Sequence, residues 1–203
     1  MGSRRRITDW PSQEATPTPW CARRRYNPRV SDPNPAGSHL AHKAQAPARI
    51  ACFILTVSDT RTAESDTSGR AIRELLEAAG HTVTDQVIVP DDPDEVTTHV
   101  EQALAEPATQ AIITTGGTGI TSRDDTFEAI DKLFEKRLDG FGELFRMLSY
   151  TEIGAAAMLS RATAGTAWRK PIFVLPGSES AVRLAMTKLI LPELGHVVQQ
   201  VTR

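Results

Sequence analysis

Three glycines within four residues form the segment of this sequence that is best suited to chemistry. Gly116, Gly117 and Gly119 enclose Thr118 and follow Thr115. Glycine tolerates positive φ and lets backbone N–H groups approach a ligand closely, and successive N–H groups in such turns form anion-binding nests. The spacing matches neither the P-loop motif nor the dinucleotide-binding fingerprint. The segment alone predicts either a tight structural turn or a phosphate cradle with added hydroxyl donors.

Two carboxylates follow this glycine loop, in the run Arg123-Asp124-Asp125. Carboxylates beside a phosphate cradle are favourable when a cation lies between them. Mg²⁺ is typically held by one or two carboxylates together with phosphate oxygens and water. Asp124 is therefore a candidate magnesium ligand. The alternative is that Asp124 or Asp125 caps the helix that follows.

Other polar segments follow predicted strands in the same way. Asp91 and Asp92 could supply a second carboxylate to the metal, or they could be solvated loop residues. Ser58, Asp59 and Thr60 either contact a ligand or form a turn.

A fourth loop, Pro176-Gly177-Ser178, follows the last predicted strand, and Glu143 lies near the start of a helical region. The Glu143 carboxylate could accept hydrogen bonds from the donor edge of a heterocycle, or it could be an ordinary surface residue. The five histidines have no metal-ligand spacing and lie outside these loops, so we expect no histidine acid–base catalysis.

The hydrophobic pattern predicts the elements that carry these loops. Residues 50–57 form a continuous apolar run, which is typical of a parallel strand covered on both faces. Further strands are expected at 81–89, 111–114, 161–167 and 170–175. Helices are expected at 66–79, capped by Ser65 or Asp66 and ended by Gly80, at 93–105, 126–134 and most of 139–160, and in a closing helix that Pro192 kinks or divides.

This order of elements predicts an α/β protein of three layers, with a mostly parallel sheet and helices on both faces. In such sheets, ligands bind beyond the carboxyl ends of the strands. The four polar loops lie at those ends, and we therefore expect them to converge on one site.

The composition divides the chain into two parts. Residues 1–48 carry eight Lys or Arg and three Asp or Glu and are rich in proline, which predicts a disordered extension. Residues 49–203 carry fifteen basic and twenty-two acidic residues and read as one α/β domain. The clusters Arg4–Arg6 and Arg23–Arg25 could bind nucleic acid, but the acidic body disfavours this.

The cysteines and the apolar runs bear on the cellular compartment. Cys21 and Cys52 are the only cysteines, which argues against a disulfide framework or zinc site and fits a reducing cytoplasm. No apolar run is long enough for a membrane span.

Six motifs occur in one order along the chain, at plausible spacing. They are Val57-Ser-Asp-Thr-Arg61, Thr115-Gly-Gly-Thr-Gly119, Arg123-Asp124, Gly140-Phe-Gly-Glu143, Leu159-Ser-Arg161 and Leu175-Pro-Gly-Ser178. In this combination, residues 48–203 resemble the MoaB/MogA family of molybdenum cofactor biosynthesis proteins. The resemblance implies a homotrimer or homohexamer that binds molybdopterin and works with other proteins of that pathway. Active members adenylylate the terminal phosphate of molybdopterin with Mg-ATP and release pyrophosphate.

The resemblance also implies roles for single residues. The two important carboxylates of the family fall on Asp91 and Asp124, as catalytic residues and magnesium ligands. Where active adenylyltransferases often have proline after the glycine loop, this chain has Ile120-Thr121-Ser122, which is typical of the MoaB branch. A non-catalytic molybdopterin-binding or accessory protein is therefore the alternative. The implied molybdopterin and phosphate contacts are Thr115, Gly116, Gly117, Gly119, Glu143, Ser160 and Ser178. The polar loops themselves add Ser58, Asp59, Thr118, Pro176 and Gly177 as candidate contacts.

Overall fold

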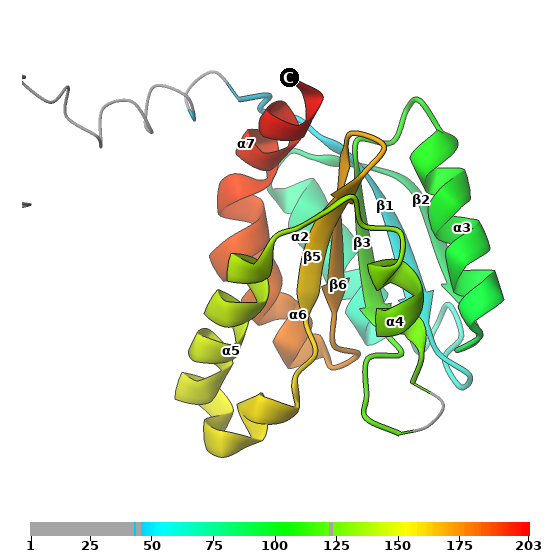
Figure 1. The fold of residues 1–203 in the computed structure, drawn as a ribbon, viewed down its shortest axis with the longest axis vertical. Coiled ribbons are helices and arrows are strands. Elements are labelled where there is room, and N and C mark those ends of the chain that lie inside the picture. The colour runs from blue at the N-terminus through cyan, green and yellow to red at the C-terminus, as the bar shows by residue number, and fades with distance from the viewer. Residues whose placement is uncertain (1–42, 44–45, 122–123) are drawn as a thin grey trace, which may run out of the picture.

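The computed structural model describes residues 43, 46–121 and 124–203. The predicted disorder and arginine clusters of the first 42 residues, Cys21 and Arg123 lie outside the described residues. Figure 1 shows a central sheet with helices on both of its faces. The predicted α/β architecture with a mostly parallel sheet is confirmed.

Six strands form one sheet in the order β2-β1-β3-β6-β5-β4. β1 pairs in parallel with β2 and β3, and β3 pairs in parallel with β6. β5 is antiparallel to both β6 and β4. The strands are β1 (Ala51–Val57), β2 (Thr82–Val89), β3 (Ala111–Gly116), β4 (Lys136–Arg137), β5 (Thr163–Ala167) and β6 (Lys170–Leu175).

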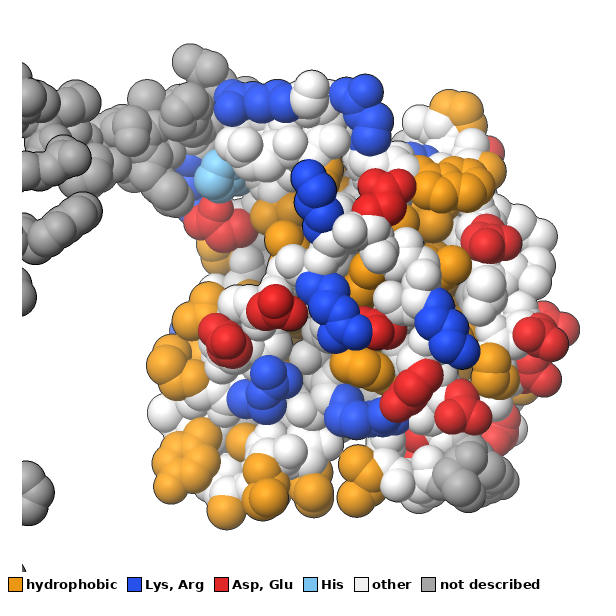
Figure 2. Space-filling model, in the orientation of Figure 1, with side chains coloured by type: hydrophobic (Ala, Val, Ile, Leu, Met, Phe, Trp, Pro, Cys, Tyr) orange, Lys and Arg blue, Asp and Glu red, His pale blue; other side chains and the backbone are white. Residues whose placement is uncertain are grey.

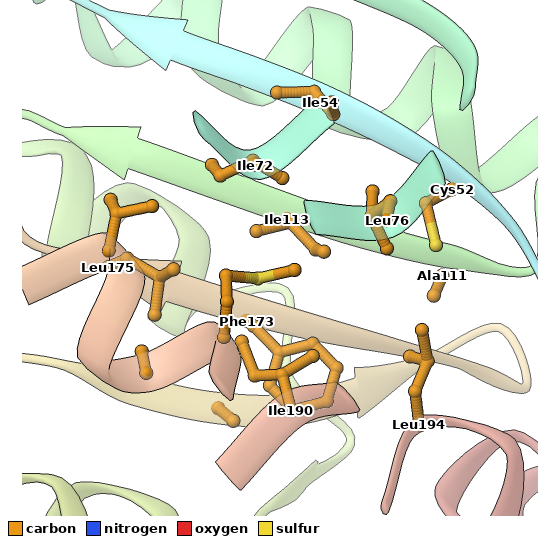
Figure 3. Packing of buried hydrophobic residues seen from close by; sticks show 14 of the residues in the cluster. Cys52, Ile54, Ile72, Leu76, Ala111, Ile113, Phe173, Leu175, Ile190 and Leu194 are labelled. Carbon is orange, nitrogen blue, oxygen red and sulfur yellow. The ribbon is translucent and has the colours of Figure 1, made fainter. Parts of the chain in front are cut away.

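The helices bury two apolar clusters against the two faces of the sheet. Along β1, Cys52 and Ile54 belong to one cluster, while Phe53 and Leu55 belong to the other, as the two-residue period of a strand requires. Helices α2 (Thr67–Ala78), α5 (Asp139–Ile153), α6 (Glu179–Ala185) and α7 (Leu191–Thr202) contribute to the first cluster, part of which is drawn in Figure 3. Helix α3 (Pro93–Ala105) and helix α4 (Thr126–Asp131) cover the opposite face. Burial in the first cluster raises the pKa of the Cys52 thiol to about 12, so this cysteine is a core residue.

Side chains near the helix ends explain where the helices begin and end. Asp66 caps α2 by accepting a hydrogen bond from the Gly69 backbone N–H, and Gly80 follows the helix with a φ of 85°. The predicted division of the last helix is also found, because a π-helix, η2 (Met186–Ile190), joins α6 to α7. Pro192 cannot donate to the carbonyl four residues before it, and the helix widens just ahead of it.

Small differences from the predicted elements occur at their ends. β3 continues to Gly116, so the glycine loop begins inside the strand. α4 ends at Asp131, and the two-residue strand β4 was not predicted. The region 139–160 is helical as expected, with α5 followed by the 3-10 helix η1 (Gly154–Leu159). Within the described ranges, every helix is too short or too polar to cross a membrane.

Candidate functional site

The four polar loops meet at the carboxyl edge of the parallel strands. The Ser58 N–H donates to the Val89 carbonyl at 2.8 Å, and the Asp91 N–H donates to Asp59 Oδ1 at 3.0 Å. Thr115 Oγ1 donates to the Pro176 carbonyl at 2.9 Å. Arg61, in the loop after β1, donates to the Gly177 carbonyl in the loop after β6 and so joins these two pairs of loops into one surface at the lower edge in Figure 1.

The glycine loop passes between two of the predicted carboxylates. Gly116 has a φ of 98°, and a Cβ atom there would lie 2.0 Å from the Val57 carbonyl oxygen. A Cβ on Gly117 would lie 2.8 Å from Asp91 Oδ1, and a Cβ on Gly119 would lie 2.5 Å from Asp124 Oδ2. The backbone therefore comes close to both carboxylates, which larger residues would prevent.

Asp91 is the more buried of these two carboxylates. Thr126 Oγ1 donates to its Oδ1 at 2.9 Å. Partial burial raises the pKa of Asp91, and the negative charges of Asp124, Asp59 and Asp125 raise it further, although the Thr126 bond opposes this. The neighbouring Asp92 is used differently, because its Oδ1 accepts from the first N–H groups of α3 and caps that helix. Asp91 is thus the member of this pair that faces the glycine loop.

Asp124 is held by the turn that precedes it. Its Oδ2 accepts from the Thr121 N–H at 2.8 Å and from Thr121 Oγ1 at 2.5 Å. These two bonds lower the pKa of Asp124, so the carboxylate stays ionised at neutral pH. Asp125 occupies the N-cap position of α4, but its side chain makes no capping hydrogen bond. The helix-cap alternative therefore does not explain either carboxylate.

The donor chemistry of this edge fits a magnesium ion that also binds a phosphate. Asp91 and Asp124 each bond a protein donor through one oxygen and have a second carboxylate oxygen. Among the described residues, no cluster of three or more histidine, cysteine or acidic side chains could hold a metal alone. Magnesium commonly uses one or two carboxylates and completes its shell with phosphate and water oxygens.

Arg161, just before β5, links the glycine loop to a separate cavity. Its Nε donates to the Thr118 carbonyl at 3.0 Å, and its Nη2 donates to the Asp124 carbonyl at 2.7 Å. The guanidinium also pairs with Glu128 and lies 5.2 Å from the centre of the Phe127 ring. Arg161 therefore fixes the carbonyl of Thr118 in the glycine loop and the carbonyl of Asp124.

The cavity beside Arg161 has a volume of about 520 Å³ and contains Glu143 and Ser160. Two more arginines line it: Arg137, which pairs with Asp131, and Arg146, which donates to the Ala162 carbonyl at 3.3 Å. Figure 2 shows basic and acidic side chains interleaved over the middle of this face. Two carboxylates, of Asp139 and Glu143, and three guanidinium groups in one cavity suit a ligand that has both a polar ring and an anionic group.

The predicted site residues thus lie in two connected places. Glu143 and Ser160 lie in the arginine-lined cavity, apart from the others. Arg161 lies in one of the six motifs and Arg137 in none, and neither was a predicted site residue, because the backbone carbonyls and acidic partners that arginine bonds leave no pattern in the sequence. The carboxyl-edge group comprises Ser58, Asp59, Asp91, Thr115, Gly116, Gly117, Thr118, Gly119, Asp124, Pro176, Gly177 and Ser178.

Residues 53–196 match the sequence profile of a family described as "probable molybdopterin binding domain". A protein of Bacillus anthracis named molybdenum cofactor biosynthesis protein B is 54% identical over 163 residues, which cover 80% of this chain and 96% of that protein.

Solved structures give the same relationship. A crystal structure of a molybdenum cofactor biosynthesis protein B is 53% identical, has a TM-score of 0.76, and covers 78% of this chain and 99% of its own. The tungsten cofactor synthesizing protein MoaB from Pyrococcus furiosus is 38% identical, with a TM-score of 0.70 and coverage of 78% of this chain and 100% of its own.

Proposed function

The chain belongs to the MoaB family of molybdenum cofactor biosynthesis proteins, and from this premise we propose that it binds molybdopterin and adenylylates the terminal phosphate of molybdopterin with Mg-ATP. The observation that carries the proposal is the glycine loop held between Asp91 and Asp124, next to the arginine-lined cavity. One ligand phosphate needs N–H donors, and a second needs a cation. The glycine loop can supply the N–H donors, and Asp91 and Asp124 can hold the cation.

The cavity is our candidate site for the pterin. The Glu143 carboxylate can accept hydrogen bonds from the donor edge of the ring, and Ser160 can add a hydroxyl contact. The arginines can pair with the anionic part of the same ligand. Arg161 belongs to both the cavity and the glycine loop, so a pterin bound there would have its phosphate next to the loop.

In the proposed reaction, an oxygen of the molybdopterin phosphate attacks the α-phosphorus of ATP. A new P–O bond forms, the bond between the α-phosphorus and the bridging oxygen breaks, and pyrophosphate leaves with that electron pair. Such transfers depend mainly on positioning and charge neutralisation. Asp91 and Asp124 would hold a magnesium ion, which would supply the neutralising charge. The glycine-loop N–H groups hold a phosphate, and no protein nucleophile is required.

The test is molybdopterin-dependent pyrophosphate release by the wild type, Asp91→Ala and Asp124→Ala. We expect each variant to lose about 10²–10³ in kcat, which is typical for loss of one transition-state contact. Asp85→Ala is the matched control, since Asp85 is an exposed aspartate of β2 away from the glycine loop. Wild-type turnover in both site variants would exclude the metal assignment.

A non-catalytic molybdopterin-binding role is the second candidate. It is supported by the hydrogen bonds from Thr121 and Thr126, which occupy one oxygen of each carboxylate with protein donors. Tight molybdopterin binding without pyrophosphate release would favour this role over adenylylation.

We also propose that the chain assembles with itself as a trimer or hexamer. Support comes from exposed apolar side chains on α5 and η1, where Figure 2 shows hydrophobic side chains at the lower left. Native mass measurement should give a multimer that Tyr150→Glu dissociates and that Trp168→Glu, at an exposed position elsewhere, does not. A monomeric wild type would exclude assembly. The side chains concerned are Leu144, Met147, Tyr150, Ile153, Met158 and Leu159.

A further inference from the structure

A buried carboxylate lies beneath the carboxyl edge, and the proposed reaction does not use it. Only 1% of Asp66 is exposed. Its Oδ2 accepts from Thr56 Oγ1 at 2.7 Å, and its Oδ1 accepts from the Gly69 N–H at 2.9 Å and from Arg61 Nη1 at 3.2 Å. A buried charge requires a partner of opposite charge and filled hydrogen-bond sites, and Asp66 has both.

Arg61 connects Asp66 to the loop after β6. Its Nη2 donates to the Gly177 carbonyl at 2.7 Å, and Ser68 Oγ donates to the same carbonyl oxygen at 2.7 Å. Two side-chain donors therefore saturate one backbone acceptor. The preceding carbonyl, of Pro176, is held by Thr115.

The fixed carbonyls determine where the N–H groups of this loop point. In a planar trans peptide, the N–H of the next residue points away from the carbonyl oxygen. The N–H groups of Gly177 and Ser178 are thus directed away from Thr115 and from the Asp66 network. Among the hydrogen bonds of the described residues, none uses either N–H group. The loop also lies against the glycine loop, since a Cβ on Gly177 would be 3.3 Å from Gly116 Cα.

We propose that Arg61, held by Asp66 and assisted by Ser68, is a positioning residue: by fixing the Gly177 carbonyl it aims the Ser178 N–H at a phosphate of the ligand, next to the Gly177 N–H that Thr115 orients. The inference rests on the proposed function, because the phosphate belongs to molybdopterin or to Mg-ATP. Arg61 need not touch the ligand. It acts by keeping the Gly177 carbonyl oxygen turned away from an anion that this oxygen would repel, as Thr115 does for the Pro176 carbonyl.

The geometry requires arginine rather than any cation. One guanidinium nitrogen bonds Asp66 while the other bonds Gly177, and this use of two fixed donors is not available to a lysine ammonium. Arg61→Lys therefore keeps the charge beside Asp66 but loses the bridge. A role limited to neutralising Asp66 would be rescued by lysine, whereas the positioning role would not be.

The experiment measures the Kd for molybdopterin by titration, and kcat and KM for Mg-ATP by pyrophosphate release. The variants are Arg61→Lys, Arg61→Met and Ser68→Ala, all tested well below their Tm. We expect kcat/KM or ligand affinity to fall about 10²-fold in both Arg61 variants, as for a small misplacement of a binding group. Ser68→Ala should cost about fivefold, the effect of one neutral hydrogen bond.

Lys170→Met is the matched control for stability. Lys170 also donates to backbone carbonyls, but at the opposite edge of the sheet. It should lower Tm and leave the Kd unchanged. Lysine rescue at position 61, or an equal loss of affinity in Lys170→Met, would overturn the positioning role.

The two proposals fail differently. A wild type that binds molybdopterin without releasing pyrophosphate would end the adenylylation proposal, and the Kd measurements would still decide the role of Arg61. A wild type that binds neither molybdopterin nor Mg-ATP would overturn both.

Discussion

The two edges of the parallel sheet are built in opposite ways. At the carboxyl edge, Asp91 and Asp124 face the glycine loop together with further negative charges, and backbone segments approach too closely for side chains. At the opposite edge, the Lys170 ammonium donates to the carbonyls of Ala103, Leu104 and Glu106 and so satisfies the end of α3. One edge therefore contributes stability, while the other holds an unfavourable charge at Asp91 that a bound magnesium ion would relieve.

The largest expected difference between the edges concerns two glycines with positive φ. Gly116→Ala would place a Cβ 2.0 Å from the Val57 carbonyl oxygen, whereas a Cβ added at Gly80 would meet no heavy atom of the described residues within 4 Å, apart from its chain neighbours. We expect Gly116→Ala to destabilise the fold by about 3 kcal/mol or more and to abolish ligand binding. Gly80→Ala carries only the backbone penalty, about 1 kcal/mol. Urea unfolding checks both, and equal losses would contradict the close approach at Gly116.

Lys170→Met tests the opposite edge. Because three carbonyls lose a charged donor, the free energy of unfolding should fall by about 2 kcal/mol. Turnover per folded molecule should not change, since the site lies at the other end of the strands. Lys136→Met, at an exposed lysine of β4, is the control and should unfold like the wild type. A loss of kcat in Lys170→Met would show that the edges are not independent.

Asp91→Asn should increase stability while it removes activity. Folding raises the pKa of Asp91 above its unfolded value, so the ionised carboxylate weakens the folded state. The free energy of unfolding of the wild type should therefore fall as the pH rises from about 4, near the unfolded pKa of aspartate, through the higher pKa of Asp91 in the folded protein. At pH 7 we expect a gain of roughly 1 kcal/mol or less for the variant, after allowing for solvent screening. Urea unfolding of both proteins at pH 4 and pH 7 measures the difference in free energy of unfolding between the variant and the wild type. A difference that does not depend on pH would refute the charge explanation.

The smallest expected effect is at the turn between β5 and β6, where Trp168 and Arg169 have φ values of 48° and 63°. Glycine adopts such angles without steric cost. Arg169→Gly should stabilise the protein by about 0.5 kcal/mol. Arg169→Ala loses the same guanidinium but keeps the backbone penalty, so it should not stabilise. A thermal melt that ranks alanine above glycine would exclude backbone strain as the cause.

The sequence predicted the framework well because its signals are local. The apolar run at 50–57, Asp66 as a cap and Pro93 at the start of a helix each act within a few residues. The hydrogen bond from Thr121 to Asp124 is also local, but it could not be predicted, because the rotation of a hydroxyl and the orientation of a carboxylate produce no repeating pattern in the sequence.

Contacts between distant segments could not be predicted in the same way. Arg161 meets the Thr118 carbonyl across 43 positions, and Arg61 meets Gly177 across 116. Every residue has a backbone carbonyl, so the type of the accepting residue gives no sign that an arginine bonds it. The motifs placed these arginines near the site, but their partners follow only from the fold.

The π-helix before α7 has a consequence for the length of the chain. One additional residue in a helix turns everything after it by about 100°. The wider turn at Met186–Ile190 absorbs that rotation, so Leu194 and Val198 stay on the same apolar cluster as Val182. A chain that lacked one residue in this turn would therefore keep the same buried face with an uninterrupted α-helix. Because Met186 and Ile190 are buried in the core, we expect such a change of length at the exposed positions Thr187 or Lys188.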